Sequence, residues 1–308
     1  MADASEKKEQ IRTSYSAPVQ PYADDTILLV SNNNLNQVSK LLSNEMKNCY
    51  HWLVNNRLSM HKGKTEALIL SSNRKRHLTR DFYIKLDEHI IKPSKTVKYL
   101  GLTINSTLSG EEIVTSIVNK SVARLKFLYR HSKALDNKTR TLLCKALIMC
   151  NFDYAIAAWH QALSKKLKEK LQVTQNKIVR FALDLGPRAH IGQNELDRIG
   201  ILSVNDRARQ LMLNQMYDIS NGTAPSYLKN DFKLQVNHYN TRSEDKNFKV
   251  PYAKGISQYN FTTAGAKEWN DLHINVKNSP SKTTFKKAVK TYLKAQAHLK
   301  ESSQCIYY

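Results

Sequence analysis

Two adjacent carboxylates, Asp24 and Asp25, stand directly before an apolar run that begins at Ile27 and ends at Val30. Neighbouring carboxylates repel each other and resist joint ionisation unless a cation lies beside them. Carboxylate oxygen is the natural ligand of Mg2+, which also binds water and substrate phosphate oxygens and can activate the attacking group in phosphoryl transfer. The pair therefore indicates metal-dependent chemistry with Mg2+ or Mn2+. The alternative is an ordinary turn, in which each carboxylate accepts a hydrogen bond from a nearby amide.

The net charge of the chain points to the substrate of that chemistry. Lys and Arg number 48 against 26 Asp and Glu, a net charge of +22 over 308 residues. A surplus of this size favours a polyanionic partner, with nucleic acid as the first candidate and an anionic membrane as the second. No run of 18 apolar residues is present, and the basic residues are spread along the chain rather than gathered on one amphipathic face. We therefore expect nucleic acid and no membrane.

The cysteines argue against a zinc site. None of the four belongs to a CxxC pair, the spacing that zinc ribbons and knuckles use to bring two thiolates to one ion. Free thiols are typical of a reducing compartment, and the first thirty residues lack the apolar core of a signal peptide. We expect an intracellular protein, nuclear or cytoplasmic. The cysteines are Cys49, Cys144, Cys150 and Cys305.

The segment that follows the aspartates mixes strand and helix signals. Apolar residues recur at helical spacing over 35–55, which predicts an amphipathic helix. No central strand is expected before the aspartates, because Pro18 and Pro21 each lack a backbone donor. Runs rich in apolar and β-branched residues predict a buried strand at 26–30 and further strands at 66–71, 82–86 and 97–104.

Beyond residue 110 the pattern becomes helical, so the fold class is α+β. Trp159 and Trp269 are expected in the core, in preference to stacking on bases, and Leu272 is expected to anchor the same packing. Residues 221–265 are polar and loop-rich. The spacing of apolar residues predicts helices at 113–131, 138–160, 164–185, 191–217 with an interruption near Gly200, and 283–300.

Three motifs carry a family resemblance. Tyr22-Ala23-Asp24-Asp25 before an apolar strand resembles the central catalytic motif of reverse transcriptases. The stretch 49–60 with Lys64-Thr65-Glu66 resembles the helix and lysine-bearing motif of non-LTR (LINE-type, jockey-like) retrotransposon enzymes, and 98–104 resembles their primer-grip hairpin. Further similarity to the thumb and tail of those proteins lies in Phe152-Asp153-Tyr154-Ala155, Trp159, Thr241-Arg242-Ser243 and Trp269-Asn270-Asp271-Leu272.

The resemblance covers residues 22 to about 295 and implies an organisation. Residues 1–20 are expected to be disordered and foreign to the family. A partial palm, a small antiparallel sheet with a helix, would occupy 21–107. A helical thumb-like region would follow at 108–190, and a helical, loop-rich, basic region would occupy 191–308.

The resemblance also implies roles for individual residues. Asp24 would be the chief metal ligand and Asp25 the auxiliary one. Lys64 would protonate or contact the departing pyrophosphate, or else be a solvated turn lysine. Tyr22 would lie near the incoming nucleotide or the primer end, unless it packs in the core. Tyr99, Leu100 and Gly101 would hold the primer. Contacts to the template–primer duplex are expected from the cations of one helix, which could equally form a solvated face: Lys165, Lys166, Lys168, Lys170, Lys177 and Arg180.

The sequence also departs from the family. A working enzyme needs another aspartate upstream of the YxDD box and fingers that hold the nucleotide, and only 21 residues precede Tyr22. We therefore expect a fragment of an RNA-directed DNA polymerase that is inactive alone. Its partners would be an RNA template, a DNA primer and a chain that supplies the missing half of the palm. The alternative is a non-catalytic, basic nucleic-acid-binding protein derived from a retroelement.

Overall fold

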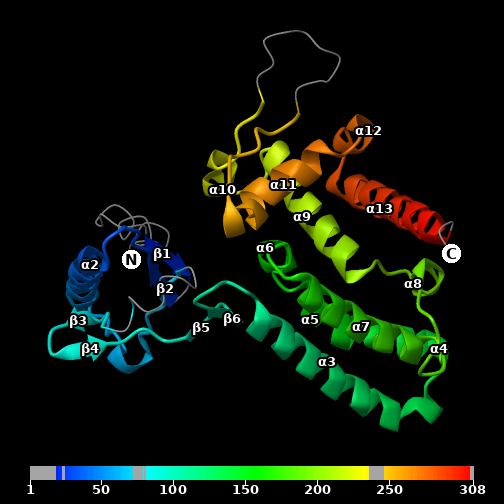
Figure 1. The fold of residues 1–308 in the computed structure, drawn as a ribbon, viewed down its shortest axis with the longest axis horizontal. Helices are drawn as coiled ribbons and strands as arrows, with labels where there is room; N and C mark the ends of the chain where they lie inside the picture. The colour runs from blue at the N-terminus through cyan, green and yellow to red at the C-terminus, as the bar shows by residue number, and fades with distance from the viewer. Residues whose placement is uncertain (1–18, 23–24, 72–78, 80, 236–245, 306–308) are drawn as a thin grey trace. The chain divides into compact units, whose positions relative to one another are not determined.

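The computed structural model describes residues 19–22, 25–71, 79, 81–235 and 246–305. The chain forms two compact units, Met1–Leu108 and Ser109–Tyr308, which Figure 1 draws in one view. Across the described ranges, no helix combines the length and the apolar composition needed to cross a lipid bilayer.

The first unit combines one long helix with β-hairpins. Asn34 caps α2, its side chain accepting a hydrogen bond from the Asn36 amide at 2.9 Å, as helix N-termini require. The helix packs on β3 around Met46, Ile84 and Leu86. The described part of this unit contains α2 (Leu35–Asn55), a short 3-10 helix η1 (Lys62–Lys64) and three antiparallel pairs, β1 (Val19–Tyr22) with β2 (Asp25–Leu28), β3 (Ile84–Leu86) with β4 (His89–Ile91), and β5 (Thr96–Tyr99) with β6 (Leu102–Asn105).

The first hairpin bears on two predictions. β1 is an edge strand, so the absence of a central strand there is not contradicted, whereas the prediction of a buried strand at 26–30 was wrong. A strand, β1, does form before the aspartates, with Pro21 opposite Thr26. It is tolerated because each strand of a two-stranded hairpin is an edge strand, where a missing donor can face outward. The strand at 26–30 is not buried, since Thr26 is exposed, Leu28 is half-buried and Leu29 is 48% exposed.

The predicted strand at 66–71 was also wrong. Its place is taken by a single parallel bridge between Ala67 and Pro93, supported by a hydrogen bond from the Ser94 amide to the Ala67 carbonyl at 2.8 Å. Pro93 has no amide hydrogen to donate, so the ladder does not extend there.

The second unit is helical and is organised around α9, which packs against α13, α11, α7 and α6. One hydrophobic core of this unit contains Trp269 and Phe285, both fully buried, and Leu272 at 4% exposure, so the expectation that Trp269 and Leu272 anchor a core is confirmed. The helices are α3 (Glu111–Arg130), α4 (Asn137–Leu143), α5 (Cys150–Asp153), α6 (Ile156–Trp159), α7 (Lys165–Ala182), α8 (Gln193–Ile199), α9 (Val204–Ser220), α10 (Ser226–Asn230), α11 (Phe261–Asn270), α12 (Ile274–Lys277) and α13 (Lys282–Cys305).

The predicted continuous helix at 138–160 was wrong. The chain leaves α4 through a π-helix, η4 (Cys144–Met149), and then breaks between α5 and α6. Ala155 lies at the break with φ +49°, a left-handed conformation that an L-residue adopts only at a cost. The Trp159 indole Nε1 donates to the Tyr154 carbonyl at 3.0 Å, and this hydrogen bond links the residues on the two sides of the break.

Candidate nucleic-acid interface

The first candidate group is the carboxylate at the end of the β1–β2 hairpin. The register pairs Tyr22, the last residue of β1, with Asp25, the first residue of β2, and Asp25 is exposed. Asp24 and Ala23 lie outside the described residues. Within the described ranges, no three His, Cys, Asp or Glu side chains come together as a metal site. The described residues therefore bring one carboxylate to this hairpin, and a metal there would need ligands from elsewhere.

Two lysines of η1 have different surroundings. Lys64, the predicted pyrophosphate contact, is exposed. Lys62 lies 3.5 Å from the Asp87 carboxylate and 4.9 Å from the centre of the Tyr50 ring, and so it links α2 to the β3–β4 turn. Lys62 is thus a structural residue, while Lys64 is accessible to a ligand.

The β5–β6 hairpin contains the three residues predicted to hold the primer. Tyr99 pairs with Leu102, so Leu100 and Gly101 form a two-residue loop with φ +45° and +80°. Positive φ at both positions is the pattern of a type I′ turn. Glycine adopts it freely, but leucine is an unusual choice there. Gly101 is exposed, and Tyr99 and Leu100 are half-buried; contact with a primer stays a prediction.

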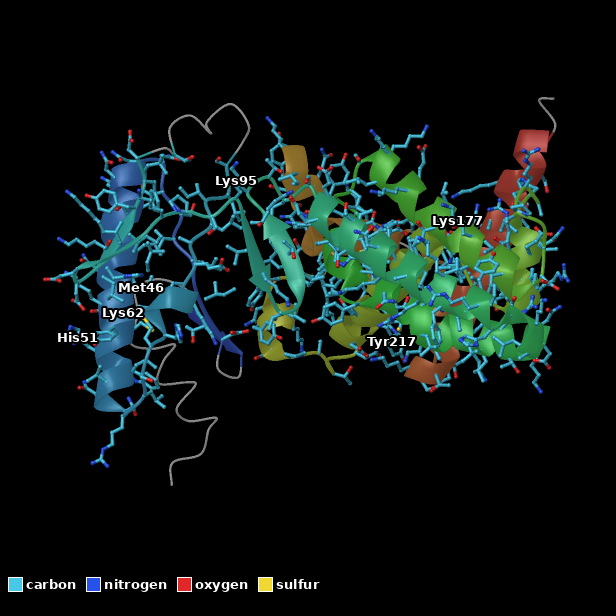
Figure 2. All side chains as sticks on the ribbon, turned by 90° about the horizontal axis from the view of Figure 1, so that it is seen from below. Met46, His51, Lys62, Lys95, Lys177 and Tyr217 are labelled. Atoms are coloured by element: carbon cyan, nitrogen blue, oxygen red, sulfur yellow. The ribbon has the colours of Figure 1, made fainter. Side chains whose placement is uncertain are left out.

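Three of the six predicted cations of α7 share one face. Lys166, Lys170 and Lys177 are exposed, with Val173 between them at 53% exposure; Lys177 is labelled in Figure 2. Steps of three, four and seven residues return to the same side of an α-helix. In the described part of the chain, none of these three lysines makes an ion pair with an acid. Within α7, the described ion pair joins Lys165 to Glu169 at 4.0 Å.

The other three cations of α7 lie elsewhere on the helix. The Lys165 side chain is 94% exposed beside Glu169. The Lys168 ammonium donates to the Gln161 carbonyl at 3.4 Å, and burial lowers the pKa of Lys168. The Arg180 Nε donates to the Ala189 carbonyl at 2.8 Å, which ties α7 to the loop that follows it. Lys168 and Arg180 thus have structural contacts of their own.

The Phe-Asp-Tyr-Ala motif has a structural role. Phe152 is 1% exposed and Trp159 is 7% exposed, so the expectation that Trp159 belongs to the core is confirmed. Asp153 binds Arg207 of α9. The residues of this motif therefore shape the α5–α6 break and attach it to α9.

The Trp-Asn-Asp-Leu motif is structural as well. The Trp269 Nε1 donates to the Lys246 carbonyl at 2.7 Å. Asn270 pairs with both backbone groups of Phe248, accepting from its amide at 2.9 Å and donating to its carbonyl at 2.8 Å. The Lys277 ammonium donates to the Asn270 carbonyl at 3.0 Å. This motif therefore fixes the segment around Phe248 to α11. The third quoted tail motif, Thr241-Arg242-Ser243, lies outside the described residues.

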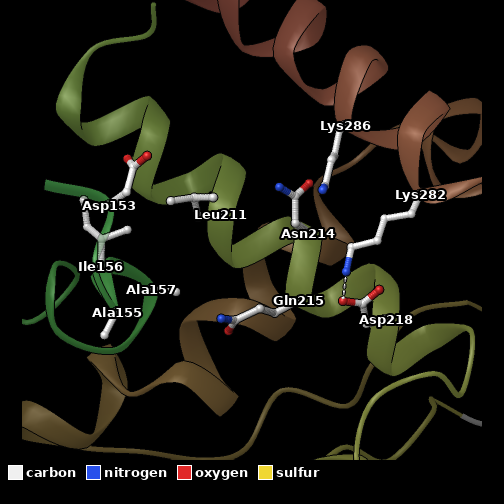
Figure 3. A pocket seen from close by; sticks show the side chains of 10 residues that line it. All are labelled: Asp153, Ala155, Ile156, Ala157, Leu211, Asn214, Gln215, Asp218, Lys282 and Lys286. Carbon is white, nitrogen blue, oxygen red and sulfur yellow. Dashed lines mark hydrogen bonds and ion pairs between the residues drawn. The ribbon is translucent and has the colours of Figure 1, made fainter. Parts of the chain in front are cut away.

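Sequence reasoning missed a cavity of about 260 Å³ in the helical unit. Its lining comes from the α5–α6 break, from α9 and from the first turns of α13 (Figure 3). The polar lining includes Asn214 and Lys286. Because these segments are far apart in the sequence, no local pattern could have indicated the cavity.

Comparisons with known proteins indicate the origin of the chain. No protein-family model matches it, and no solved structure matches it. The retrovirus-related Pol polyprotein from type-1 retrotransposable element R1 2 of Nasonia vitripennis is 23% identical over 150 residues, which cover 46% of this chain and 36% of that protein. The corresponding polyprotein of element R1 3 from the same organism is 23% identical over 179 residues, 53% of this chain and 46% of that protein. The chain thus has a retrotransposon-related origin and spans less than half the length of either relative.

Proposed function

We propose that this chain is part of an RNA-directed DNA polymerase of a non-LTR retrotransposon and that it binds the RNA template and the DNA primer. The observation that carries this proposal is a row of lysines on α7 that pair with no described acid, Lys166, Lys170 and Lys177. The relation to Pol polyproteins and the net charge of +22 support it.

The spacing of these lysines suits a phosphate backbone. At a rise of 1.5 Å per residue, Lys166 and Lys177 are separated by about 16 Å along the helix axis, so the three side chains can reach separate phosphates of a nucleic-acid backbone. Each lysine that neutralises a phosphate releases condensed counterions, so the affinity of such a contact falls steeply as salt rises. Val173 between the lysines offers an apolar surface to the sugar backbone.

The catalytic part of the proposal concerns the hairpin. In the intact polymerase Asp24 and Asp25 would hold Mg2+ or Mn2+, with further ligands from a partner chain and from the nucleic acid. Lys64, which is exposed on η1, would contact the pyrophosphate. The β5–β6 turn would contact the primer. A second candidate function is non-catalytic binding of nucleic acid, which the same row of lysines supports.

The binding proposal is tested by measuring the affinity for an RNA–DNA hybrid against salt concentration, with fluorescence anisotropy. Changing Lys166, Lys170 and Lys177 together to Gln should weaken binding at low salt and reduce the slope of log affinity against log salt by about 3. The matched control changes three exposed lysines on α10, α11 and α13, Lys229, Lys267 and Lys287, with the same loss of charge. Equal effects of the two triple variants would refute a specific role for α7.

Primer extension separates the two candidate functions. With an RNA template, a DNA primer and Mg2+ or Mn2+, we expect no extension by this chain alone. Extension that disappears in Asp25→Ala, while Asp81→Ala retains it, would instead assign catalysis to this chain. Asp81 is an exposed aspartate of the same unit, so it controls for the loss of one surface charge.

A further inference from the structure

We propose that a surface near the start of α11 binds single-stranded RNA by stacking unpaired bases on the rings of Tyr252 and Tyr259. The inference rests on the proposed function, in which the RNA template is single-stranded beyond the hybrid. It differs from the contact proposed for α7, which would hold a duplex backbone. The residues of this surface, named here the tyrosine surface, are Lys233, Lys249, Tyr252, Lys254 and Tyr259.

The two tyrosine rings are open to solvent. Tyr252 is 86% exposed and Tyr259 is 47% exposed. The Lys254 ammonium lies over the Tyr252 ring, 5.5 Å from its centre, which is within the range of cation–π contact. The opposite face of this ring is therefore left for a base. Stacking of bases on exposed aromatic rings is the usual way in which proteins hold single strands, because every base has a π-face.

The segment that contains both tyrosines is anchored at its two ends. Val250 and Phe261 pack against the hydrophobic core that includes Trp269. Between them, the stretch 251–260 contains a 3-10 helix, η5 (Gly255–Tyr259), which packs on α11. Because the backbone of this exposed stretch is held by the core, less ordering is needed when a strand binds.

Two lysines beside this segment stand directly opposite each other. Leu234 and Phe248 form an antiparallel bridge, and the Lys249 amide donates to the Lys233 carbonyl at 2.8 Å. This register places Lys233 opposite Lys249, on the face of the pair away from the buried Phe248, and both lysines are exposed. Like charges opposite each other across two strands are destabilising. A phosphate bound by both ammonium groups would relieve this repulsion.

Aromatic contacts bring the lysine pair and the tyrosines into one region. The centre of the Phe232 ring lies 5.4 Å from that of Phe248 and 5.7 Å from that of Phe261. The antiparallel pair and the start of α11 therefore share one cluster. Tyr252 and Tyr259 are four residues and two residues from the nearer of these rings along the chain. Each tyrosine Cα thus lies within about 14 Å of the cluster.

The charge of these segments favours a polyanion. The stretch 246–267 contains four lysines and no acid, and Glu268, which follows it, is bound by Arg209 at 2.8 Å. The stretch 225–235 contains two lysines and one acid, Asp231. Exposed rings among excess cations are typical of surfaces that bind single strands.

The rings select the form of the nucleic acid. A duplex keeps its bases stacked inside and offers no free face to Tyr252 or Tyr259, so a single strand is favoured. A tyrosine hydroxyl can donate to or accept from a 2′-hydroxyl, the group that distinguishes RNA from DNA. The tyrosine surface therefore fits unpaired RNA better than it fits duplex or DNA.

The experiment measures binding of the full-length chain by fluorescence anisotropy. The probes are an oligouridylate of about 12 nucleotides, within the range of single-strand site sizes, the corresponding oligodeoxyuridylate, and an RNA–DNA hybrid of the same length. We expect the RNA strand to bind more tightly than the DNA strand.

Substitutions of one tyrosine test the stacking. Tyr252→Leu should weaken binding of the oligouridylate about tenfold, a difference of about 1.4 kcal/mol, and Tyr259→Leu should act in the same direction. Tyr252→Phe retains the ring and should retain most of the affinity. The matched control is Tyr83→Leu, at a tyrosine of the first unit that is 49% exposed. Because Tyr252 is almost fully exposed, its variants should fold like the wild type.

Salt dependence tests the lysines. Each phosphate of a single strand that a lysine neutralises contributes about 0.7 to the slope of log affinity against log salt. Changing Lys233, Lys249 and Lys254 together to Gln should therefore reduce this slope for the oligouridylate by about 2. The matched control removes the same charge from three exposed lysines of α3 and α4, Lys120, Lys126 and Lys138.

The proposal is overturned if the oligouridylate does not bind saturably at low salt, if the RNA and DNA strands bind equally, or if Tyr252→Leu and Tyr83→Leu have equal effects. Equal salt slopes in the two triple variants would overturn it as well. The triple variant of the α7 lysines should bind the hybrid weakly and the oligouridylate normally, whereas Tyr252→Leu should do the reverse. Failure of the duplex-binding proposal and failure of this one are therefore distinguishable.

Discussion

Arg207 on α9 binds both carboxylate oxygens of Asp153 at the end of α5, with Nε to Oδ1 at 3.0 Å and Nη2 to Oδ2 at 2.7 Å. Asp153 stands immediately before the α5–α6 break, so this bidentate pair attaches the break to the central helix of the second unit. The same contact neutralises one of the two acids that line the cavity between the α5–α6 break, α9 and α13.

Replacing the two guanidinium donors of Arg207 by the single ammonium of a lysine should weaken the attachment of the α5–α6 break to α9. Arg207→Lys keeps the charge but loses one of the two parallel hydrogen bonds. Because the two side chains are 37% and 34% exposed, we expect a loss of only about 1 kcal/mol in the free energy of unfolding, measured by urea denaturation. Arg198→Lys, an exposed arginine of α8, is the control. Equal stability of the two variants would contradict a structural role for the pair.

His160 should make the helical unit sensitive to acid. It is 1% exposed, neither ring nitrogen has a hydrogen-bond partner within the described residues, and burial, followed by the nearby Lys168 charge, lowers the pKa of His160 to about 4. The unfolded chain takes up this proton near pH 6.5, while the folded chain takes it up only near pH 4. The contribution of the neutral His160 ring to the free energy of unfolding is therefore fully present above pH 6.5, and it is lost as the pH drops from 6.5 to 4.

The test compares the free energy of unfolding at pH 7.5 and pH 5. This histidine alone should lower the stability of the wild type by about 2 kcal/mol between those values, and His160→Leu should remove that part of the pH dependence. Removing two unpaired buried nitrogens should also leave the variant at least as stable at neutral pH. His131→Leu, an exposed histidine of the same unit, should keep the pH dependence of the wild type. An identical pH dependence in His160→Leu would refute the assignment.

The Asn270 side chain pairs with both backbone groups of Phe248. Asn270→Ala leaves the amide and the carbonyl of Phe248 without their side-chain partners, which should cost about 1–3 kcal/mol. Asn270→Asp keeps the acceptor but loses the donor, so its loss should be of similar size. Hydrogen exchange at the Phe248 amide and thermal unfolding measure the effect. Asn275→Ala, at an exposed position of α12, should be close to neutral, and unchanged exchange at Phe248 in Asn270→Ala would rule the pairing out.

A substitution of Leu100 distinguishes the stability of the β5–β6 hairpin from its binding of nucleic acid. Asn-Gly is the preferred pair for a loop with positive φ at both positions, so Leu100→Asn should relieve the left-handed leucine and protect the amides of 96–105 more strongly against exchange. If the side chain of Leu100 contacts the primer, the same variant should bind an RNA–DNA hybrid more weakly. A more stable hairpin with unchanged binding would exclude that contact.

The long helices could be predicted because their signals are local. The spacing of apolar residues predicted helices at 113–131 and 164–185, which the structure gives as Glu111–Arg130 and Lys165–Ala182. Ser164 stands directly before the second helix and caps it, its side chain accepting from the Leu167 amide. A polar cap before an apolar stripe marks a helix start without any knowledge of the rest of the fold.

The break at Ala155 could not be predicted for the opposite reason. The sequence there has no glycine or proline, so nothing local disfavours a helix. Contacts with distant residues impose the break, above all Asp153 with Arg207, 54 positions further along the chain. At the candidate hairpin, sequence reasoning identified the adjacent acids but did not foresee the edge strand β1, because the two prolines argue only against a central strand.

The π-helix Cys144–Met149 has a consequence for how this unit tolerates length changes. A π turn holds one residue more than an α turn, so the wider turn behaves as a retained single-residue insertion. Deleting Ala146 would let the segment wind as a regular α-helix, and the narrower turn would absorb the loss. Asp153 would then still face α9, whereas the loss of a residue from a regular α-helix rotates everything after it by about 100° around the axis. The π turn is thus a place where this segment can lose one residue without changing the geometry downstream.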